Sequence, residues 1–161
     1  MKLRPNNKKF TRLYRQLLYR VAGGVILLLT TTGRKSGMEH TVGLQYELID
    51  GRYYVGASDG TRADWLRNIQ SNPEVTVQAG KLKFRARAEV VSDASEIARF
   101  LAYRLKKRPI LIRSILRTAG LKGKPDQAAL EEYAQMIRMA IFTPVQHTQN
   151  TPGASQADLS L

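Results

Sequence analysis

The pattern of hydrophobic positions changes along the chain, and each change predicts an element. Residues 8–20 carry apolar side chains at helical spacing with Lys and Arg off that stripe, and Gly23-Gly24 ends the predicted helix. Strand patterns follow over 25–32, 39–49 and 52–57. The first of these runs is largely apolar, so we expect it in the middle of a sheet. Asp50-Gly51 predicts a tight turn between the other two strands.

A helix and a hairpin are expected next. Thr61 and Asp64 resemble a capping box, with Thr61 as the N-cap, and the helix they open ends at Asn72-Pro73. One face of this helix carries Trp65, Leu66 and Ile69. Residues 74–91 form a predicted hairpin that turns at Ala79-Gly80-Lys81. Its second arm alternates between apolar and charged residues, which indicates one buried and one solvent-exposed face.

The C-terminal third is predicted to be mainly helical. Helical patterns run over 93–107, from Pro109 onward, and over 126–139, with Asp126 as an N-cap. Residues 141–145 form a predicted last strand, placed at a sheet edge because it contains Pro144. The polar residues 146–161 are expected to be disordered.

Short, mostly antiparallel strands with few helices predict a mainly β fold with added helices (α+β), a small β-barrel. The alternating strand–helix order of a Rossmann fold is absent. With 161 residues, one domain is expected over 1–145. It includes a basic N-terminal helix (8–20) and a helical insertion (93–139), and the tail follows it.

The net charge of +13 is concentrated in two segments. Residues 1–20 carry seven Lys and Arg and residues 99–124 carry nine, with no acid in either. Both segments are expected to attract something anionic, either an acidic coenzyme tail or an anionic membrane surface. Alternatively, their apolar stripes pack on the barrel and the charges are solvated. No nucleic-acid partner is predicted, because no RNP-like or helix-turn-helix pattern accompanies the charge.

Cysteine is absent, and His40 and His147 match no metal-binding spacing, so neither disulfides nor a metal site is predicted. The longest apolar run is too short to span a bilayer, and no signal-peptide cleavage site follows it. These features favour a cytoplasmic protein, with peripheral contact to the inner face of the membrane as an alternative.

Candidate binding chemistry lies in the turn after the first strand. Gly33 and Gly37 bracket Arg34, Lys35 and Ser36, which places two cations, a hydroxyl group and flexible backbone N–H groups at one turn. Such a turn suits a phosphate or carboxylate group. The alternative is a basic, solvated hairpin turn.

Three stretches in this order resemble the deazaflavin-dependent nitroreductase family. They are LTTTGRKSG at 29–37, VGASDG at 55–60 and WLRNIQSNPEV at 65–75. The resemblance implies a split β-barrel related to the FMN-binding, pyridoxine-phosphate-oxidase-like fold. It also implies binding of coenzyme F420, which carries a phosphate and an oligoglutamate tail, with FMN as the alternative cofactor.

The resemblance implies a role for each matching position. Arg34, Lys35 and Ser36, held between Gly33 and Gly37, would contact the phosphate or the tail, and His40 could donate to an oxyanion. Ala57 and Ser58 would offer backbone and hydroxyl groups to the ring or phosphate, Trp65 would pack against the coenzyme, and Asn68 would support that wall. Two positions depart from the family pattern. Asp59 stands where many relatives have Lys, and Gln45 stands where the best-studied relatives have a Tyr.

The implied reaction is hydride transfer from reduced F420 to an electron-poor small molecule such as a quinone, a nitro compound or an enone. Candidate proton donors are Ser58, Tyr46, Tyr54 and Tyr133, each of which also has a purely structural interpretation. A non-catalytic F420-, FMN- or anionic-lipid-binding module is the alternative function. The protein is expected to be a monomer or a homodimer.

Overall fold

The computed structural model describes residues 26–121 and 123–145. The predicted helix 8–20 and the predicted tail 146–161 lie outside the described residues. The elements are β1 (Ile26–Thr32), β2 (Glu39–Gln45), β3 (Glu47–Ile49), β4 (Arg52–Ala57), a 3₁₀ turn η1 (Gly60–Arg62), α2 (Asp64–Ser71), β5 (Glu74–Ala79), β6 (Leu82–Val91), α3 (Ala94–Lys107), α4 (Pro109–Thr118), α5 (Gln127–Met136) and β7 (Arg138–Pro144).

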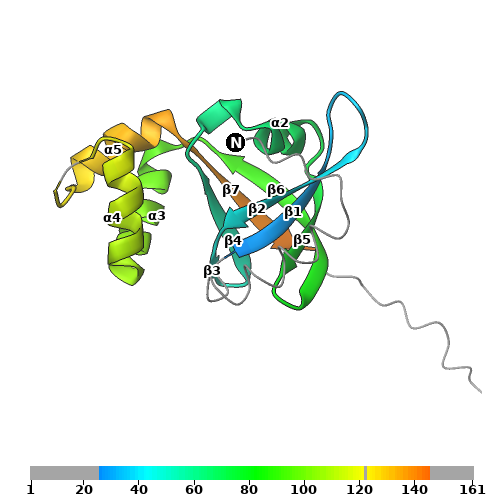
Figure 1. Ribbon diagram of the computed structural model, residues 1–161, viewed down its shortest axis with the longest axis horizontal. Coiled ribbons are helices and arrows are strands. Elements are labelled where there is room, and N and C mark those ends of the chain that lie inside the picture. The colour runs from blue at the N-terminus through cyan, green and yellow to red at the C-terminus, as the bar shows by residue number, and fades with distance from the viewer. Residues whose placement is uncertain (1–25, 122, 146–161) are drawn as a thin grey trace, which may run out of the picture.

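All seven strands belong to one antiparallel sheet in the order β2-β1-β5-β6-β7-β4-β3. The two outer strands, β2 and β3, follow each other directly in the chain, and β2 also approaches β4. The sheet therefore curls into a barrel (Figure 1). The predicted fold class, mainly β with added helices, is confirmed.

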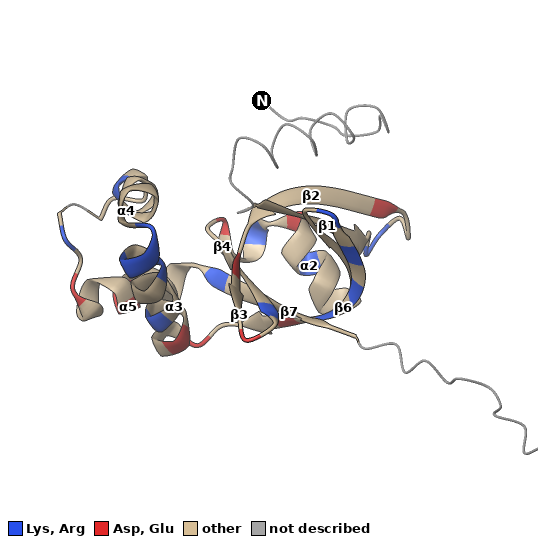
Figure 2. Ribbon diagram, turned by 90° about the horizontal axis from the view of Figure 1, so that it is seen from below, with Lys and Arg blue, Asp and Glu red and all other residues tan. Residues whose placement is uncertain are grey.

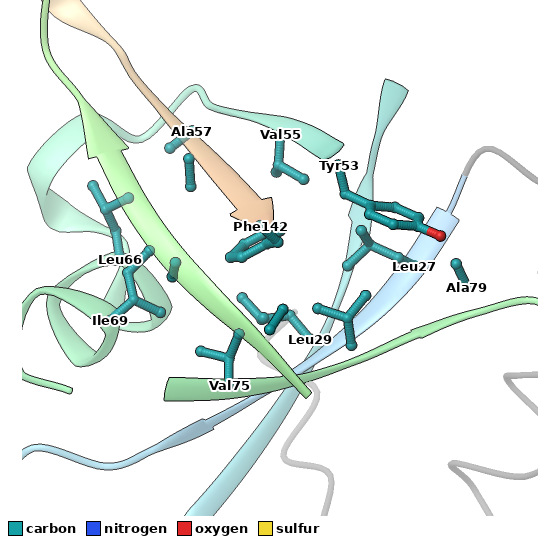
Figure 3. Packing of buried hydrophobic residues seen from close by; sticks show 14 residues of the cluster. Leu27, Leu29, Tyr53, Val55, Ala57, Leu66, Ile69, Val75, Ala79 and Phe142 are labelled. Atoms are coloured by element: carbon teal, nitrogen blue, oxygen red, sulfur yellow. The ribbon is translucent and has the colours of Figure 1, made fainter. Parts of the chain in front are cut away.

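The barrel interior is packed with side chains from alternate strand positions (Figure 3). Leu27 and Leu29 of β1 meet Phe142 of β7, and all three are fully buried. Leu66 and Ile69 of α2 add to the same core from one end of the barrel. The alternation that predicted the strands thus also places their apolar residues.

A second core lies between the sheet and helices α3, α4 and α5, which stand together on one side of the barrel (Figure 1). It contains Ile97 and Leu101 of α3, Ile112 and Leu116 of α4, and Met139 of β7. The apolar stripes of α3 and α4 are therefore covered by the protein itself, as the packing alternative predicted. None of the described helices is long and apolar enough to cross a bilayer.

The single strand predicted over 39–49 is wrong, because it is interrupted at Tyr46. Residues of β2 pair with β1, whereas β3 pairs with β4 at the other end of the sheet. The bend at Tyr46 moves the chain from one outer edge of the curled sheet to the other. A hydrophobic pattern reports which face a residue occupies but not which neighbour its strand pairs with, so the bend was missed.

The predicted edge position of the last strand is also wrong. β7 lies between β6 and β4, and it starts at Arg138, where a helix was expected to continue to 139. Pro144 is the last residue of β7 and lies opposite Ala86. Because proline lacks an N–H group only at this last position, β7 loses no hydrogen bond in its middle. A strand with proline at its end can therefore lie inside the sheet.

The capping box predicted at Thr61 is wrong as well. Thr61 lies in the 3₁₀ turn, and α2 starts at Asp64 after Ala63, which provides no side-chain cap. The Thr61 carbonyl instead accepts a hydrogen bond from Arg67 Nε at 2.7 Å. The end of the helix at Asn72 is as predicted.

Candidate functional site

The turn between β1 and β2 is shaped by its two glycines. Gly37 has a φ of +68°, a left-handed conformation that glycine adopts readily. A Cβ atom on Gly33 would lie 2.7 Å from both His40 Nε2 and Ser36 Oγ. Because Gly33 has no side chain, Ser36 Oγ and His40 Nε2 approach each other to 3.4 Å across the turn.

Asn68 of α2 fixes the orientation of Arg34 through its side-chain amide group. Its Oδ1 accepts hydrogen bonds from the backbone N of Arg34 at 3.2 Å and from Arg34 Nη1 at 3.1 Å. Its Nδ2 donates to Thr31 Oγ1 at 3.1 Å, and both Asn68 and Thr31 are buried. Arg34 is thus oriented before any ligand arrives, which reduces the entropy lost on binding. The structural role of Thr31 was not predicted from the sequence.

These residues surround a pocket of about 470 Å³, which we call the basic-turn pocket. Its walls are Thr31, Gly33, Arg34, Lys35, Ser36, His40, Thr41, Val42, Asp64, Trp65 and Asn68. Seven of the ten predicted cofactor-binding positions come together here. Gly37, Ala57 and Ser58 are not part of its lining.

Asp64 is a member of the basic-turn pocket that the sequence indicated only as a capping residue. Its Oδ1 lies 3.1 Å from Arg34 Nη2. The Asp64 side chain is 81% exposed, so solvent screens this pair and it contributes about 0–1 kcal/mol. Because the pair is weak, Asp64 does not prevent Arg34 from binding an anionic ligand.

A second cavity, of about 280 Å³, lies between the sheet and the three C-terminal helices, and we call it the helical cavity. It is lined by Gly43, Leu44, Gln45, Gly56, Ser58, Leu101, Arg104, Ile112, Ile115, Leu116, Tyr133 and Ile137. Two of the predicted proton donors, Ser58 and Tyr133, therefore share one cavity.

The side chains of Ala57, the last residue of β4, and of Ser58, which directly follows it, lie on different sides of the sheet. Tyr53, Val55 and Ala57 point into the barrel core, whereas Gly56 and Ser58 border the helical cavity. The resemblance implied that Ala57 offers its backbone groups to the coenzyme, and the burial of its side chain in the core is compatible with that role.

The remaining predicted positions, Tyr46, Tyr54 and Asp59, line neither cavity. The Tyr46 ring packs against the barrel core, 5.4 Å from the Tyr53 ring, and the Tyr54 ring lies 5.8 Å from that of Phe100. Asp59 borders a hollow beside α5 that shares Ser58 and Tyr133 with the helical cavity but no residue with the basic-turn pocket. Its charge therefore does not line the basic-turn pocket. Among residues 26–121 and 123–145, no group of three acidic or histidine side chains is placed to hold a metal ion.

Burial raises the pKa of the Tyr133 phenol above its ordinary value. Its hydroxyl group therefore stays protonated at neutral pH and can donate a hydrogen bond into the helical cavity.

The raised pKa of Tyr133 predicts a pH dependence of stability. The protonated Tyr133 phenol contributes its full stabilisation below the unfolded-state pKa of about 10. This contribution is lost as the pH rises through the higher folded-state pKa. Tyr133→Phe should therefore lose less stability than the wild type between neutral pH and pH values above about 10. Urea unfolding across that range measures this, with Tyr103→Phe as the control at a more exposed tyrosine. If the free energy of unfolding changed with pH in the same way in the wild type and in Tyr133→Phe, the prediction would be contradicted.

Comparison with known proteins identifies the family. Residues 2–112 match the family model described as F420H(2)-dependent quinone reductase. The chain belongs to this family. It is accordingly an oxidoreductase that uses coenzyme F420 in its reduced form. The F420-dependent family that the three sequence stretches predicted is confirmed.

Solved structures extend the likeness to the fold. A structure described as an F420-H2 dependent reductase (FDR-A) is 24% identical, with a TM-score of 0.51, and the match covers 73% of this chain and 93% of that one. A putative pyridoxamine 5'-phosphate oxidase from Listeria innocua is 15% identical (TM-score 0.53, 83% and 94% covered). The heme storage protein HutZ from Vibrio cholerae is 18% identical (TM-score 0.54, 86% and 90% covered). These likenesses show a split barrel of the pyridoxamine-phosphate-oxidase type. No curated protein matches the chain.

Proposed function

We propose that this F420H2-dependent oxidoreductase holds the acidic part of F420 in the basic-turn pocket and reduces a quinone bound in the helical cavity. The observation that carries the proposal is the fixed position of Arg34, which Asn68 binds through two hydrogen bonds at the wall of a pocket with three further polar donors. Those donors are Lys35, Ser36 and His40.

The donor set fits a phosphate or carboxylate group. A guanidinium group binds oxyanions through two parallel hydrogen bonds, and the exposed Lys35 adds a second charge. The hydroxyl group of Ser36 and the ring nitrogen of His40 meet over Gly33, so both can turn toward an anionic oxygen. FMN shares a phosphate with F420 but lacks the acidic tail, for which Lys35 is a further partner.

Strand β2 connects the two sites. Its residues 40–42 line the basic-turn pocket and residues 43–45 line the helical cavity. The distance from His40 to Leu44 along the strand is roughly 13 Å, from the rise per residue of a β-strand. An elongated coenzyme anchored at the basic turn can therefore extend along β2 toward an acceptor in the helical cavity. Trp65 would form part of its wall.

The chain's own contribution to the chemistry is binding, orientation and exclusion of water. Reduced F420 supplies a hydride when it is bound. Leu44, Leu101 and Ile112 make the helical cavity largely apolar, which suits the flat ring of a quinone. The hydroxyl groups of Ser58 and Tyr133 can donate hydrogen bonds to a quinone oxygen there.

A cavity-filling variant tests the placement of the acceptor. A Cβ atom on Gly56 would have no described heavy atom within 4 Å, and its φ is not left-handed, so Gly56→Leu fills the helical cavity without backbone strain. We expect its KM for menadione, with reduced F420 as the donor, to rise about tenfold or more, by loss of apolar contact area. The Kd for F420 should stay within about threefold of the wild type.

Lys83→Leu is the control, because it adds the same side chain at an exposed position on β6. An unchanged KM in Gly56→Leu would remove the quinone from this cavity. The same assay with a nitroaromatic compound and an enone in place of menadione compares the three acceptor classes.

A further inference from the structure

Arg104 belongs to a charged cluster that joins α3 to the barrel. At its centre is Glu47, which is 2% exposed. Lys107 Nζ lies 3.0 Å and Arg108 Nε 3.2 Å from its carboxylate oxygens, whereas Arg104 Nε is farther away, at 3.6 Å. Three cations thus surround one acid. Because Lys107 and Arg108 already neutralise Glu47, its charge alone does not account for Arg104.

One donor of the Arg104 guanidinium group makes no hydrogen bond to a described residue. The residue is 7% exposed, yet its Nε has no hydrogen-bond partner among the described residues. Its Nη2 donates to Gln45 Oε1 at 3.1 Å. A guanidinium group carries five N–H donors, and leaving buried donors unused is costly. Such a group in a folded protein calls for an explanation.

The surroundings of Arg104 suggest that explanation. Arg104 and Gln45 both line the helical cavity, together with the hydroxyl-bearing Ser58 and Tyr133. Most of the other lining is aliphatic, so the local dielectric constant is low and a nearby cation acts strongly on any charge in the cavity. A buried cation at the wall of an apolar cavity, which the Glu47 carboxylate contacts only at 3.6 Å, is suited to an anionic oxygen.

We propose that Arg104 is a catalytic residue of the quinone reduction, which stabilises the negative charge that develops on the acceptor oxygen, and that Gln45 is a positioning residue that aims its guanidinium group. This rests on the proposed function, which puts the acceptor in the helical cavity. Gln45 Oε1 accepts the hydrogen bond from Arg104 Nη2 at the wall of the helical cavity, so the Gln45 side chain can fix the direction of the guanidinium group.

Transfer of a hydride, which is two electrons and one proton, from reduced F420 would convert the quinone to a hydroquinone monoanion with its charge on oxygen. The oxidised coenzyme would release its remaining proton to solvent. Arg104 is already charged and keeps its proton, so it stabilises this oxygen electrostatically. A proton from solvent then completes the hydroquinone. A preorganised donor of this kind typically contributes a factor of about 100 or more to the rate.

The test uses two probes and no coenzyme. 2-Hydroxy-1,4-naphthoquinone is an anion at neutral pH and mimics the charged acceptor, whereas 1,4-naphthoquinone is neutral and nearly the same size. The ratio of their Kd values, measured by calorimetry on the full chain, reports the preference for an anionic oxygen. We expect the wild type to prefer the anion, and Arg104→Met to reduce that preference by about tenfold or more.

Lys107→Met is the matched control, since Lys107 also binds Glu47 but does not line the helical cavity. Its ratio should equal that of the wild type. No preference for the anion in the wild type, or an equal loss in Lys107→Met, overturns the inference, and so does an unchanged ratio in Arg104→Met.

If Arg104→Met does not fold, Gln45→Leu decides instead, because it leaves the contacts of Glu47 intact. We expect it to reduce the ratio by about threefold or more, and an unchanged ratio overturns the inference. A separate F420 titration of the wild type keeps the two proposals apart. Failure to bind F420 would refute the basic-turn site, whereas the probe ratio tests Arg104 alone.

Discussion

Replacing Arg34 and Lys35 together by alanine is expected to weaken F420 binding by about 100-fold or more. Each side chain would supply a charge-assisted hydrogen bond to the phosphate or the acidic tail, and such bonds contribute about 1.5–3 kcal/mol each. Two of them amount to a factor of about 100 to 20,000 in Kd. Arg34 is also held by Asn68, so its orientation costs little on binding.

Isothermal titration calorimetry with F420 measures this effect. The matched control is Lys81→Ala plus Lys83→Ala, which removes two exposed positive charges from the β5–β6 hairpin, away from the basic-turn pocket. A change in net charge alone would weaken binding equally in both double variants. Equal weakening would therefore show that long-range attraction acts here, and direct contact at the basic turn would be disproved.

Glu47→Gln is expected to lower the free energy of unfolding by about 3–5 kcal/mol, the usual cost of breaking a buried ion pair from one side. Glu47 lies on the short strand β3, and its partners Arg104, Lys107 and Arg108 all lie on α3 or just after it. Without the carboxylate, a buried guanidinium group would be left with repelling neighbours. The attachment of α3 to the barrel should weaken as a result.

Urea unfolding of the two proteins measures this difference. Glu89→Gln is the control, because Glu89 is an exposed glutamate on β6, and its effect should be within about 0.5 kcal/mol. A loss in Glu47→Gln no larger than that in Glu89→Gln would show that the cluster adds nothing to stability.

The sequence predicted the strands and the hairpin well because their alternation is local. It could not predict the break at Tyr46 or the burial of Glu47. A glutamate in a strand-like run normally indicates a solvent-exposed face, and the residues that neutralise it come from α3, far away along the chain. The edge position predicted from Pro144 failed for a similar reason. Whether a proline disrupts a sheet depends on where along the strand the pairing ends, and the sequence does not show that position.

The basic turn was predictable because two glycines and two cations are adjacent in the chain. The helical cavity was not, because its walls come from β2, β4 and three helices. The pair Ala57 and Ser58 illustrates the limit. Both were expected at the coenzyme, Ala57 through its backbone and Ser58 through its hydroxyl group. Ala57 is the last residue of β4 and buries its side chain in the core, whereas Ser58 directly follows the strand and lines the helical cavity. The sequence showed Gln45 only as a departure from the family pattern, and its hydrogen bond with Arg104 was not predicted.

The most direct test of the central claim uses Trp65, the single tryptophan of the chain, which lines the basic-turn pocket. F420 and, separately, FMN are titrated into the purified protein while the Trp65 emission is followed. We expect saturable quenching of the Trp65 emission by F420 at micromolar concentrations. Absence of quenching by F420, with or without quenching by FMN, would contradict the placement of F420 at the basic turn.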